Sequence, residues 1–253
     1  VEVITAATKE EEHFHLTCEA MEKVIKPSTK AILINSPSNP TGAVLSLDEL
    51  KAIAQFAKER DLIVISDEPY ESIVYDGRKN YSIAALPDMF ARTITVNSFS
   101  KTFAMTGWRV GYAVAEEAFI NAMTIMQESL TSSVNAASQY AACVALTSPK
   151  DEVEEMRRVY EKRAELLERG LNRIKGFSFI KPEGAFYAFV NIKDTGMTSE
   201  EVSQRLIEEC QVVTTPGSAF GAAGEGYIRI SFASSSEILE EAVNRIQSVF
   251  GTK

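Results

Sequence analysis

Thr93-Ile94-Thr95-Val96-Asn97-Ser98-Phe99-Ser100-Lys101 places a lysine just after a short apolar run that has the pattern of a buried strand. In this position Lys101 stands near the end of the strand and is flanked by hydroxyl side chains. Lysine forms Schiff bases with carbonyl compounds, and it becomes nucleophilic when desolvation or a nearby cation lowers its pKa. Most lysines are solvated surface residues, so Lys101 alone does not establish a site. The surrounding sequence decides between a surface loop and a reactive amine.

Strand and helix patterns alternate up to about residue 115, as is typical of α/β layering. Ala31-Ile32-Leu33-Ile34 is a continuous apolar run, which predicts a strand buried on both faces. Ser46-Leu47-Asp48-Glu49 resembles a capping box, and apolar residues at helical spacing follow it as far as Ala57. Leu62-Ile63-Val64-Ile65 predicts a second buried strand, and residues 109–114 predict another after the Thr93–Val96 strand.

Polar residues follow the predicted strands at their carboxyl ends. Asn39 comes after the first strand, Asp67 after the second and Lys101 after the third. In open α/β sheets, ligands bind at this edge. We therefore expect three separate strands to bring these groups to one rim of the sheet.

The pattern changes from about Asp151, where a long charged helix begins. The elements predicted from there are helices over 151–174, 199–210 and 237–250 and strands over 185–190 and 227–232, with a Gly-rich loop over 216–226. This order is typical of an α+β domain. The predicted fold class is therefore α/β, with a mostly parallel α/β/α sheet in residues 1–150. A smaller α+β domain is predicted for residues 151–253, with the long helix as connector.

Composition narrows the partners. The chain has 253 residues, is 45% hydrophobic and carries a formal net charge of -9 without a basic cluster, so nucleic acid and anionic membranes are poor partners. Its three cysteines are far apart, which suits a reducing, cytoplasmic compartment. Only two histidines occur, and we predict no metal site. No signal peptide and no apolar run long enough to span a membrane are visible.

Five short motifs occur in a fixed order along the chain. They are Asn39-Pro40-Thr41-Gly42, Asp67-Glu68-Pro69-Tyr70, Ser98-Phe99-Ser100-Lys101, Gly107-Trp108-Arg109-Val110-Gly111-Tyr112 and Ile228-Arg229-Ile230-Ser231. From near Ala31 to the C-terminus, the sequence resembles the class I/II aminotransferases, which are pyridoxal-phosphate enzymes of fold type I. The resemblance implies pyridoxal 5'-phosphate as cofactor and makes residues 1–150 the large cofactor-binding domain.

The resemblance also implies a catalytic set. Lys101 resembles the Schiff-base lysine, which holds the cofactor aldehyde and, when released, moves the proton at the substrate Cα. Asp67 resembles the partner that keeps the pyridine nitrogen protonated, a lysine-plus-aspartate arrangement that is general for this cofactor. Asn39 and Tyr70 resemble the pair that hydrogen-bonds the phenolic oxygen of the cofactor, and Tyr70 counts with the catalytic residues.

The remaining roles concern phosphate and substrate. Ser98 and Arg109 resemble phosphate ligands, and Ser100 is expected to assist them. Arg229 resembles the arginine that binds the substrate α-carboxylate, a planar two-pronged match, and Asn39 is expected to contact the substrate as well. Each residue also has a plain structural alternative, such as a helix cap, a turn or a surface ion pair. Their joint occurrence with Lys101 favours the site.

Class I/II aminotransferases, the family that this sequence resembles, normally have a further stretch of chain before the point where this chain begins. That stretch carries a phosphate-binding loop at a helix N-terminus and an aromatic ring that stacks on the cofactor. Neither element is found before Ala31, and Val1-Glu2-Val3-Ile4 has the pattern of a strand inside a domain. We therefore expect a C-terminal portion of an aminotransferase, with impaired activity and weakened cofactor binding.

The implied activity is amino transfer from an α-amino acid to a 2-oxo acid such as 2-oxoglutarate. Aspartate is the favoured donor, because the Lys101–Tyr112 stretch resembles prokaryotic aspartate and aromatic aminotransferases. A C–S β-lyase on the same scaffold is an alternative, because the same carbanion is stabilised. An effector domain of an aminotransferase-like transcription regulator is another. Family members are usually dimers, so a homodimer is expected for the full-length protein.

Overall fold

The computed structural model describes residues 2–253, which divide into two compact units. Unit 1 contains residues 2–8, 15–37 and 44–154, and unit 2 contains residues 9–14, 38–43 and 155–253. Two short segments, 9–14 and 38–43, therefore belong with the later part of the chain although they come early in the sequence. The predicted domain boundary near residue 150 stays a prediction.

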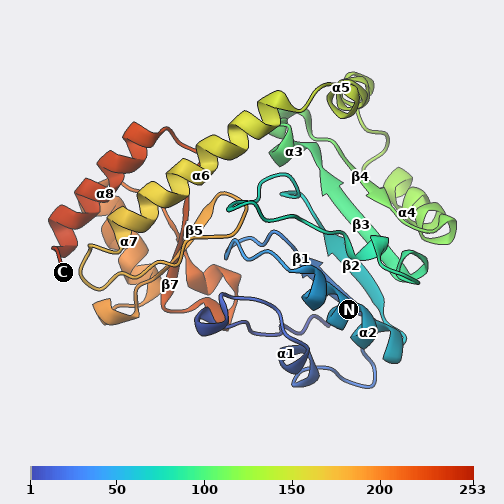
Figure 1. The fold of residues 1–253 in the computed structure, drawn as a ribbon, viewed down its shortest axis with the longest axis horizontal. Coiled ribbons are helices and arrows are strands. Elements are labelled where there is room, and N and C mark those ends of the chain that lie inside the picture. The colour runs from blue at the N-terminus through green and yellow to red at the C-terminus, as the bar shows by residue number, and fades with distance from the viewer. Residues whose placement is uncertain (1) are drawn as a thin grey trace. The chain divides into compact units, whose positions relative to one another are not determined.

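Unit 1 is built on a four-stranded sheet (Figure 1). Its strands are β1 (Ala31–Asn35), β2 (Ile63–Asp67), β3 (Thr93–Ser98) and β4 (Gly111–Val114), in that spatial order. The first three strands are parallel, and β4 runs antiparallel to β3. The predicted class, a mostly parallel α/β sheet, is confirmed.

The helices of unit 1 are α1 (Cys18–Glu22), α2 (Leu47–Glu59), α3 (Phe99–Thr102), α4 (Glu117–Leu130) and α5 (Ala136–Thr147). The predicted capping box begins α2, since the side chain of Ser46 accepts from the Glu49 N–H and the Glu49 carboxylate accepts from the Ser46 N–H. The apolar face of α2, which includes Leu50 and Ile53, packs with Ile34 of β1 in the core of the unit. Burial of such aliphatic side chains contributes roughly 1.5–3 kcal/mol each.

The prediction that β1 is buried on both faces is wrong. Ile34 is 3% exposed, whereas Leu33, which points to the opposite face, is 65% exposed. Successive side chains of a strand alternate between faces, and α2 covers only one of them. The predicted strand at the N-terminus is also absent from the described residues, because residues 2–4 have no regular structure and residue 1 lies outside the description.

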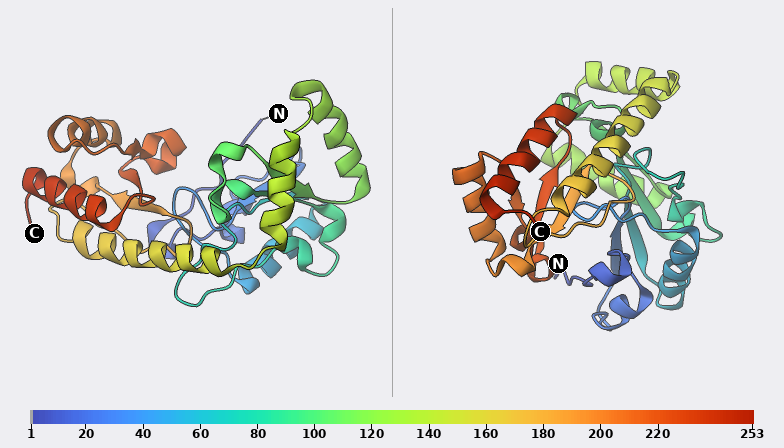
Figure 2. Two further views of the ribbon diagram at one scale, coloured as in Figure 1. Left: turned by 90° about the horizontal axis from the view of Figure 1, so that it is seen from above. Right: turned by 60° about the vertical axis from the view of Figure 1, so that its left-hand side comes forward.

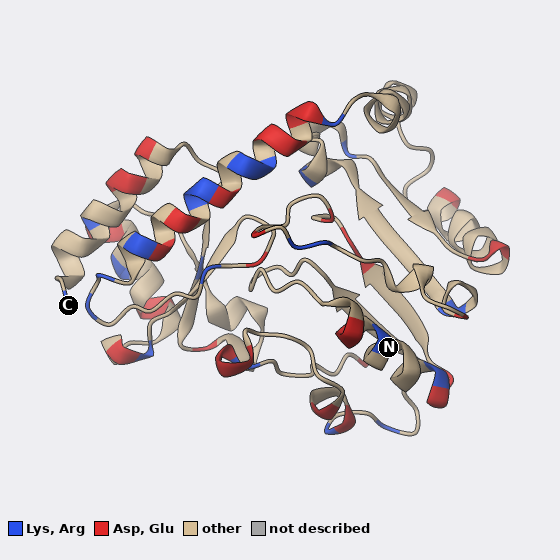
Figure 3. Ribbon diagram, viewed as in Figure 1, with Lys and Arg blue, Asp and Glu red and all other residues tan. Residues whose placement is uncertain are grey.

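Two helices of unit 1 expose apolar side chains. None of the residues of α4 is buried, and Ile125, Met126 and Leu130 are exposed on it. On α5, Tyr140 and Val144 are exposed, and Figure 3 shows that this helix carries no charged residue. Exposed apolar side chains that gather into a patch often mark an interaction site.

Unit 2 has a small antiparallel sheet in the order β5 (Tyr187–Asn191), β7 (Tyr227–Ser231) and β6 (Thr215–Pro216). Its helices are the long α6 (Asp151–Leu171), which begins just before the unit, α7 (Ser199–Cys210) and α8 (Ser236–Phe250). Helix α8 lies beside α6, where a Cβ on Gly170 would meet Val243 Cγ1 at 2.7 Å (Figure 2). Glycine is therefore required at this close approach.

Short 3-10 helices connect these elements. They are Glu10–Glu12, Ile83–Ala85, Phe90–Arg92, Thr106–Trp108, Lys193–Thr195, Gly217–Phe220 and Ala222–Gly224. Within residues 2–253, no helix combines the length and the apolar character that crossing a membrane requires.

Candidate functional site

Asp67 is the last residue of β2, at the carboxyl edge of the unit 1 sheet. The strand register pairs it with Asn35, the last residue of β1, whose Nδ2 donates to Asp67 Oδ2 at 3.1 Å and to the Asp67 carbonyl at 3.0 Å. Burial raises the pKa of the Asp67 carboxyl. The motifs did not identify Asn35, although its position after the Ala31–Ile34 run could have done so.

Lys101 lies on α3, a single turn that begins directly after β3. Ser98 caps this helix, since its Oγ accepts from the backbone N–H of Ser100 at 3.1 Å. Phe99 is buried and stacks on Phe103 with a centroid distance of 5.3 Å, which fixes one side of the turn. Lys101 itself is half-buried.

Hydrogen bonds join the segment after β2 to the segment after β3. The Glu68 N–H donates to the carbonyl of Val96 at 2.9 Å. Farther along, Thr102 Oγ1 donates to Glu71 Oε1 at 3.0 Å. Tyr70, only 4% exposed, lies in the joined segment next to Glu71. The segments that follow β2 and β3, which carry these predicted residues, are therefore joined at the carboxyl edge of the sheet. Figure 1 shows the two strands side by side.

Arg109, two residues before the start of β4, lies at the same edge of the sheet. The register pairs Ser98 with Gly111, and the Phe99 N–H donates to the carbonyl of Val110 at 3.3 Å, so Arg109 follows on beside α3. Its side chain is exposed and donates from Nη1 to the carbonyl of Thr106 at 3.1 Å. Its φ of 49° lies in the left-handed region, a conformation that costs energy in a residue other than glycine and is concentrated at functional sites.

A second set of predicted residues lies in unit 2, around Arg229 of β7. Arg229 Nη1 donates to Asn39 Oδ1 at 2.9 Å, and Nη2 donates to Thr215 Oγ1 at 3.1 Å. The guanidinium carbon lies 4.6 Å from the ring centre of Tyr187 and 5.0 Å from that of Phe220, a cation–π arrangement on two rings.

The Arg229 Nε is buried and has no hydrogen-bond partner within the part of the chain that the structure describes. A buried donor without an acceptor is costly, and an acceptor that reached this nitrogen would remove that cost. Thr215 was not predicted. Its place opposite Arg229 follows from the β6–β7 register, which the sequence does not show.

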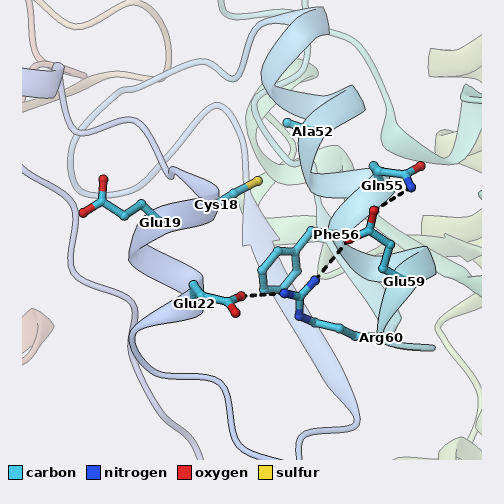
Figure 4. Close-up of a pocket in the computed structure, with 8 residues that line it drawn as sticks. All are labelled: Cys18, Glu19, Glu22, Ala52, Gln55, Phe56, Glu59 and Arg60. Atoms are coloured by element: carbon cyan, nitrogen blue, oxygen red, sulfur yellow. Dashed lines mark hydrogen bonds and ion pairs between the residues drawn. The ribbon is translucent and has the colours of Figure 1, made fainter.

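Of the eight predicted site residues, six belong to unit 1 and two, Asn39 and Arg229, belong to unit 2. An open groove elsewhere in unit 1 shares none of them. Its lining is Cys18, Glu19, Glu22, Ala52, Gln55, Phe56, Glu59 and Arg60 (Figure 4). Arg60 lies 3.9 Å from the ring centre of Phe56 and is paired with Glu22 at 2.7 Å. These contacts explain the groove as a packed surface between α1 and α2.

No group of three or more His, Cys, Asp or Glu side chains among residues 2–253 could hold a metal ion.

Residues 1–246 match the family model described as aminotransferase class I and II. The sequence is 51% identical to aromatic-amino-acid aminotransferase 2 of Thermococcus litoralis and 50% identical to an aspartate aminotransferase of Pyrococcus abyssi. Each comparison covers 99% of this chain and 64% of the relative, so the chain spans less than two thirds of the length of these curated relatives.

Solved structures show the same likeness. The crystal structure of an aromatic aminotransferase from Pyrococcus horikoshii superposes with a TM-score of 0.94 at 48% identity, over 97% of this chain and 66% of that one. An aspartate aminotransferase from Thermus thermophilus with maleate gives a TM-score of 0.91 at 36% identity, over 97% of this chain and 63% of that one.

Proposed function

Because the chain belongs to the aminotransferase class I and II family, we propose that it acts as a pyridoxal-phosphate-dependent transaminase on an α-amino acid and a 2-oxo acid. The observation that carries the proposal is the joined edge of unit 1. There the segments of Asp67 and Lys101 are connected by the Thr102–Glu71 hydrogen bond. A carboxylate and an amine at the carboxyl ends of adjacent parallel strands suit this cofactor.

The environment of Asp67 fits a cationic ring nitrogen. Its carboxylate accepts from the neutral Asn35 amide, and burial raises the pKa of the Asp67 carboxyl. A protonated pyridine nitrogen would place a positive charge beside this carboxylate and favour its ionised form. In return, the Asp67 carboxylate would keep the nitrogen protonated.

The hydroxyl and guanidinium groups beside α3 fit a phosphate. Ser98 and Ser100 lie at the start of the turn that carries Lys101, and Arg109 follows on beside it. A guanidinium offers two parallel N–H donors to phosphate oxygens, which makes Arg109 the strongest proposed ligand of the three.

When bound, pyridoxal phosphate supplies an electron-accepting ring that stabilises negative charge at the substrate Cα. The residues of this chain do the rest. The Lys101 amine would hold the cofactor covalently and, when released, would move the proton at the substrate Cα. Tyr70, and by the family resemblance also Asn39, would donate a hydrogen bond to the phenolic oxygen of the cofactor.

Arg229 would bind the substrate α-carboxylate through the N–H donors of its planar guanidinium. Among these donors, Nε has no hydrogen-bond partner in the described part of the chain. Asn39 Oδ1, which accepts from Arg229 Nη1, fixes the guanidinium at that site. The rings of Tyr187 and Phe220 hold the plane of the guanidinium and exclude water from it.

Aspartate is the proposed amino donor and 2-oxoglutarate the proposed acceptor. Aspartate aminotransferases among the relatives support this choice, although aromatic-amino-acid aminotransferase 2 is equally similar. The C–S β-lyase and the regulator domain are not favoured, because these relatives are aminotransferases by name. The test is transfer of ¹⁵N from labelled aspartate to 2-oxoglutarate, followed by mass spectrometry. Labelled glutamate supports the function, whereas oxo-acid formation that does not require the acceptor contradicts it.

We also propose a homodimer for the full-length protein and a cytoplasmic location. The exposed apolar residues of α4 and α5 support an interface, and the unpaired Cys18, Cys143 and Cys210 support a reducing compartment. Light scattering on the purified protein should give twice the monomer mass. A monomer over the micromolar concentration range contradicts the proposed dimer.

A further inference from the structure

On the premise of the proposed function, we infer that Glu71 is a positioning residue that holds the α3 turn, and with it Lys101, against the segment that carries Asp67 and Tyr70. Glu71 belongs to none of the residues with an assigned role. It follows Tyr70 directly, and its acceptor atom contacts the residue directly after Lys101.

The contact is made by a carboxylate in a confined place. Glu71 Oε1 accepts from Thr102 Oγ1 at 3.0 Å, and Thr102 is only 2% exposed. Glu71 Oε2 is buried and has no hydrogen-bond partner in the described part of the chain. The Thr102 bond connects this carboxylate to the α3 turn, and a hydrogen bond to a charged acceptor is stronger than one between neutral groups.

Glu71 also faces the strand before the turn. Burial raises the pKa of Glu71, and the polar side chains of Thr102, Asn97 and Ser72 act in the opposite direction. Asn97 is buried, and its Oδ1 accepts from the Ser98 N–H at 2.7 Å. Polar groups on both sides of the Ser98–Lys101 segment thus lie next to one carboxylate.

The turn needs such support. A helix of four residues makes few internal hydrogen bonds and is not stable by itself. Phe99, the first residue of the turn, is anchored in the apolar core, and Thr102 is the last residue of the turn. The bond to Glu71 is the side-chain hydrogen bond that ties the end of this turn to the segment after β2.

The variants separate positioning from stability. Thr102→Val keeps the shape of the side chain and removes the donor, and Glu71→Ala removes the acceptor. Glu71→Gln keeps an amide oxygen that can accept from Thr102, so it is the conservative variant. Ser82→Ala is the matched control, because it removes a hydroxyl that donates at 2.8 Å to the carboxylate of Glu68 and not to that of Glu71.

Two readouts are measured on the folded chain. The first is the acylation rate of Lys101 by acetic anhydride relative to that of the exposed Lys51, determined by mass spectrometry and requiring no cofactor. The second is the dissociation constant of pyridoxal phosphate, with the position of its visible absorption band.

We expect Thr102→Val and Glu71→Ala to raise the Lys101-to-Lys51 rate ratio about tenfold, which corresponds to loss of one such hydrogen bond, and to weaken cofactor binding similarly. Glu71→Gln and Ser82→Ala should stay within about twofold of the wild type in both readouts. Should Glu71→Ala fail to fold, Thr102→Val decides.

An unchanged rate ratio and an unchanged dissociation constant in Thr102→Val would overturn the role of Glu71. A wild-type chain that does not bind pyridoxal phosphate, while Thr102→Val still shifts the rate ratio, would overturn the proposed function and leave the positioning role standing. The two failures are therefore distinguishable.

Discussion

Arg229→Lys keeps the positive charge but replaces the planar fork by a single ammonium group. The lysine can reach Asn39 or Thr215 but not both, so one hydrogen bond from a charged donor is lost, about 1.5–3 kcal/mol. The substitution also removes the buried, unpaired Nε, which relieves a cost of about 1–3 kcal/mol. These terms oppose each other, so the free energy of unfolding should change by no more than about 2 kcal/mol.

Carboxylate binding should respond differently. A planar fork matches two carboxylate oxygens, and an ammonium group does not, so the dissociation constant should rise about 10- to 100-fold, or about 1.4–2.8 kcal/mol. The assay is calorimetric titration with succinate, a dicarboxylate that cannot react, together with urea unfolding of the same samples.

Arg205→Lys is the control for this experiment. Arg205 is a partly exposed arginine of α7 that donates to Glu209 at 2.9 Å and lies 4.8 Å from the ring centre of Phe250, so the same chemical change occurs away from the proposed site. It should leave succinate binding unchanged. A loss of several kcal/mol of stability in Arg229→Lys with unchanged succinate affinity would refute the reasoning, because Arg229 would then be a structural residue.

Three further predictions concern unit 1. Burial raises the pKa of Glu68 above its ordinary 4.5, although hydrogen bonds from serine side chains act in the opposite direction. The folded state therefore holds the proton more tightly than the unfolded state, and stability falls as pH rises from 4.5 through the raised pKa. Glu68→Gln should flatten this decline in urea midpoints measured from pH 4 to 8, and an unchanged slope would disprove the assignment. Burial acts to raise the pKa of Glu49, but interactions with Ser46 and His15 lower this pKa overall. The stability that the Glu49 carboxylate contributes is therefore present above pH 4.5 and is lost as pH falls through the lowered pKa. Glu49→Gln should reduce the acid sensitivity of the same urea midpoints, and equal acid sensitivity in the variant and the wild type would count against this role of Glu49. A Cβ on Gly111 would lie 2.7 Å from the Asn97 carbonyl oxygen, whereas a Cβ on Gly107 would meet nothing within 4 Å. Gly111→Ala should therefore lower the free energy of unfolding in urea by about 1–3 kcal/mol, and Gly107→Ala by less than about 1 kcal/mol. Equal losses of stability would contradict the close approach of β3 and β4.

Elements governed by local sequence could be predicted well. Helix α7 has the predicted bounds, Ser199–Cys210, because Thr198 and Glu201 form a capping box and the apolar residues follow at helical spacing. The strands β2 and β3 could also be predicted from local sequence, because a short apolar run indicates a buried strand. Their parallel pairing followed from the alternation of strands and helices.

Contacts between distant segments could not be predicted. The Asn35–Asp67 hydrogen bond joins residues 32 positions apart, and the Thr102–Glu71 bond joins residues 31 apart. Both depend on the register between neighbouring strands, which no single segment encodes. The exposure of Leu33 was missed for a related reason, since an apolar run shows that a strand can be buried but not how many of its faces are covered.

The most direct measurement is reductive trapping of pyridoxal phosphate on the purified protein, with peptide mapping of the modified lysine. The chain is incubated with an equimolar amount of the cofactor, reduced with sodium borohydride and digested. We predict that the modification lies on Lys101 and that Lys101→Ala abolishes it, while an exposed lysine such as Lys51 is hardly modified. Modification spread over exposed lysines, or none on Lys101, would contradict the assignment of Lys101 as the cofactor-binding residue.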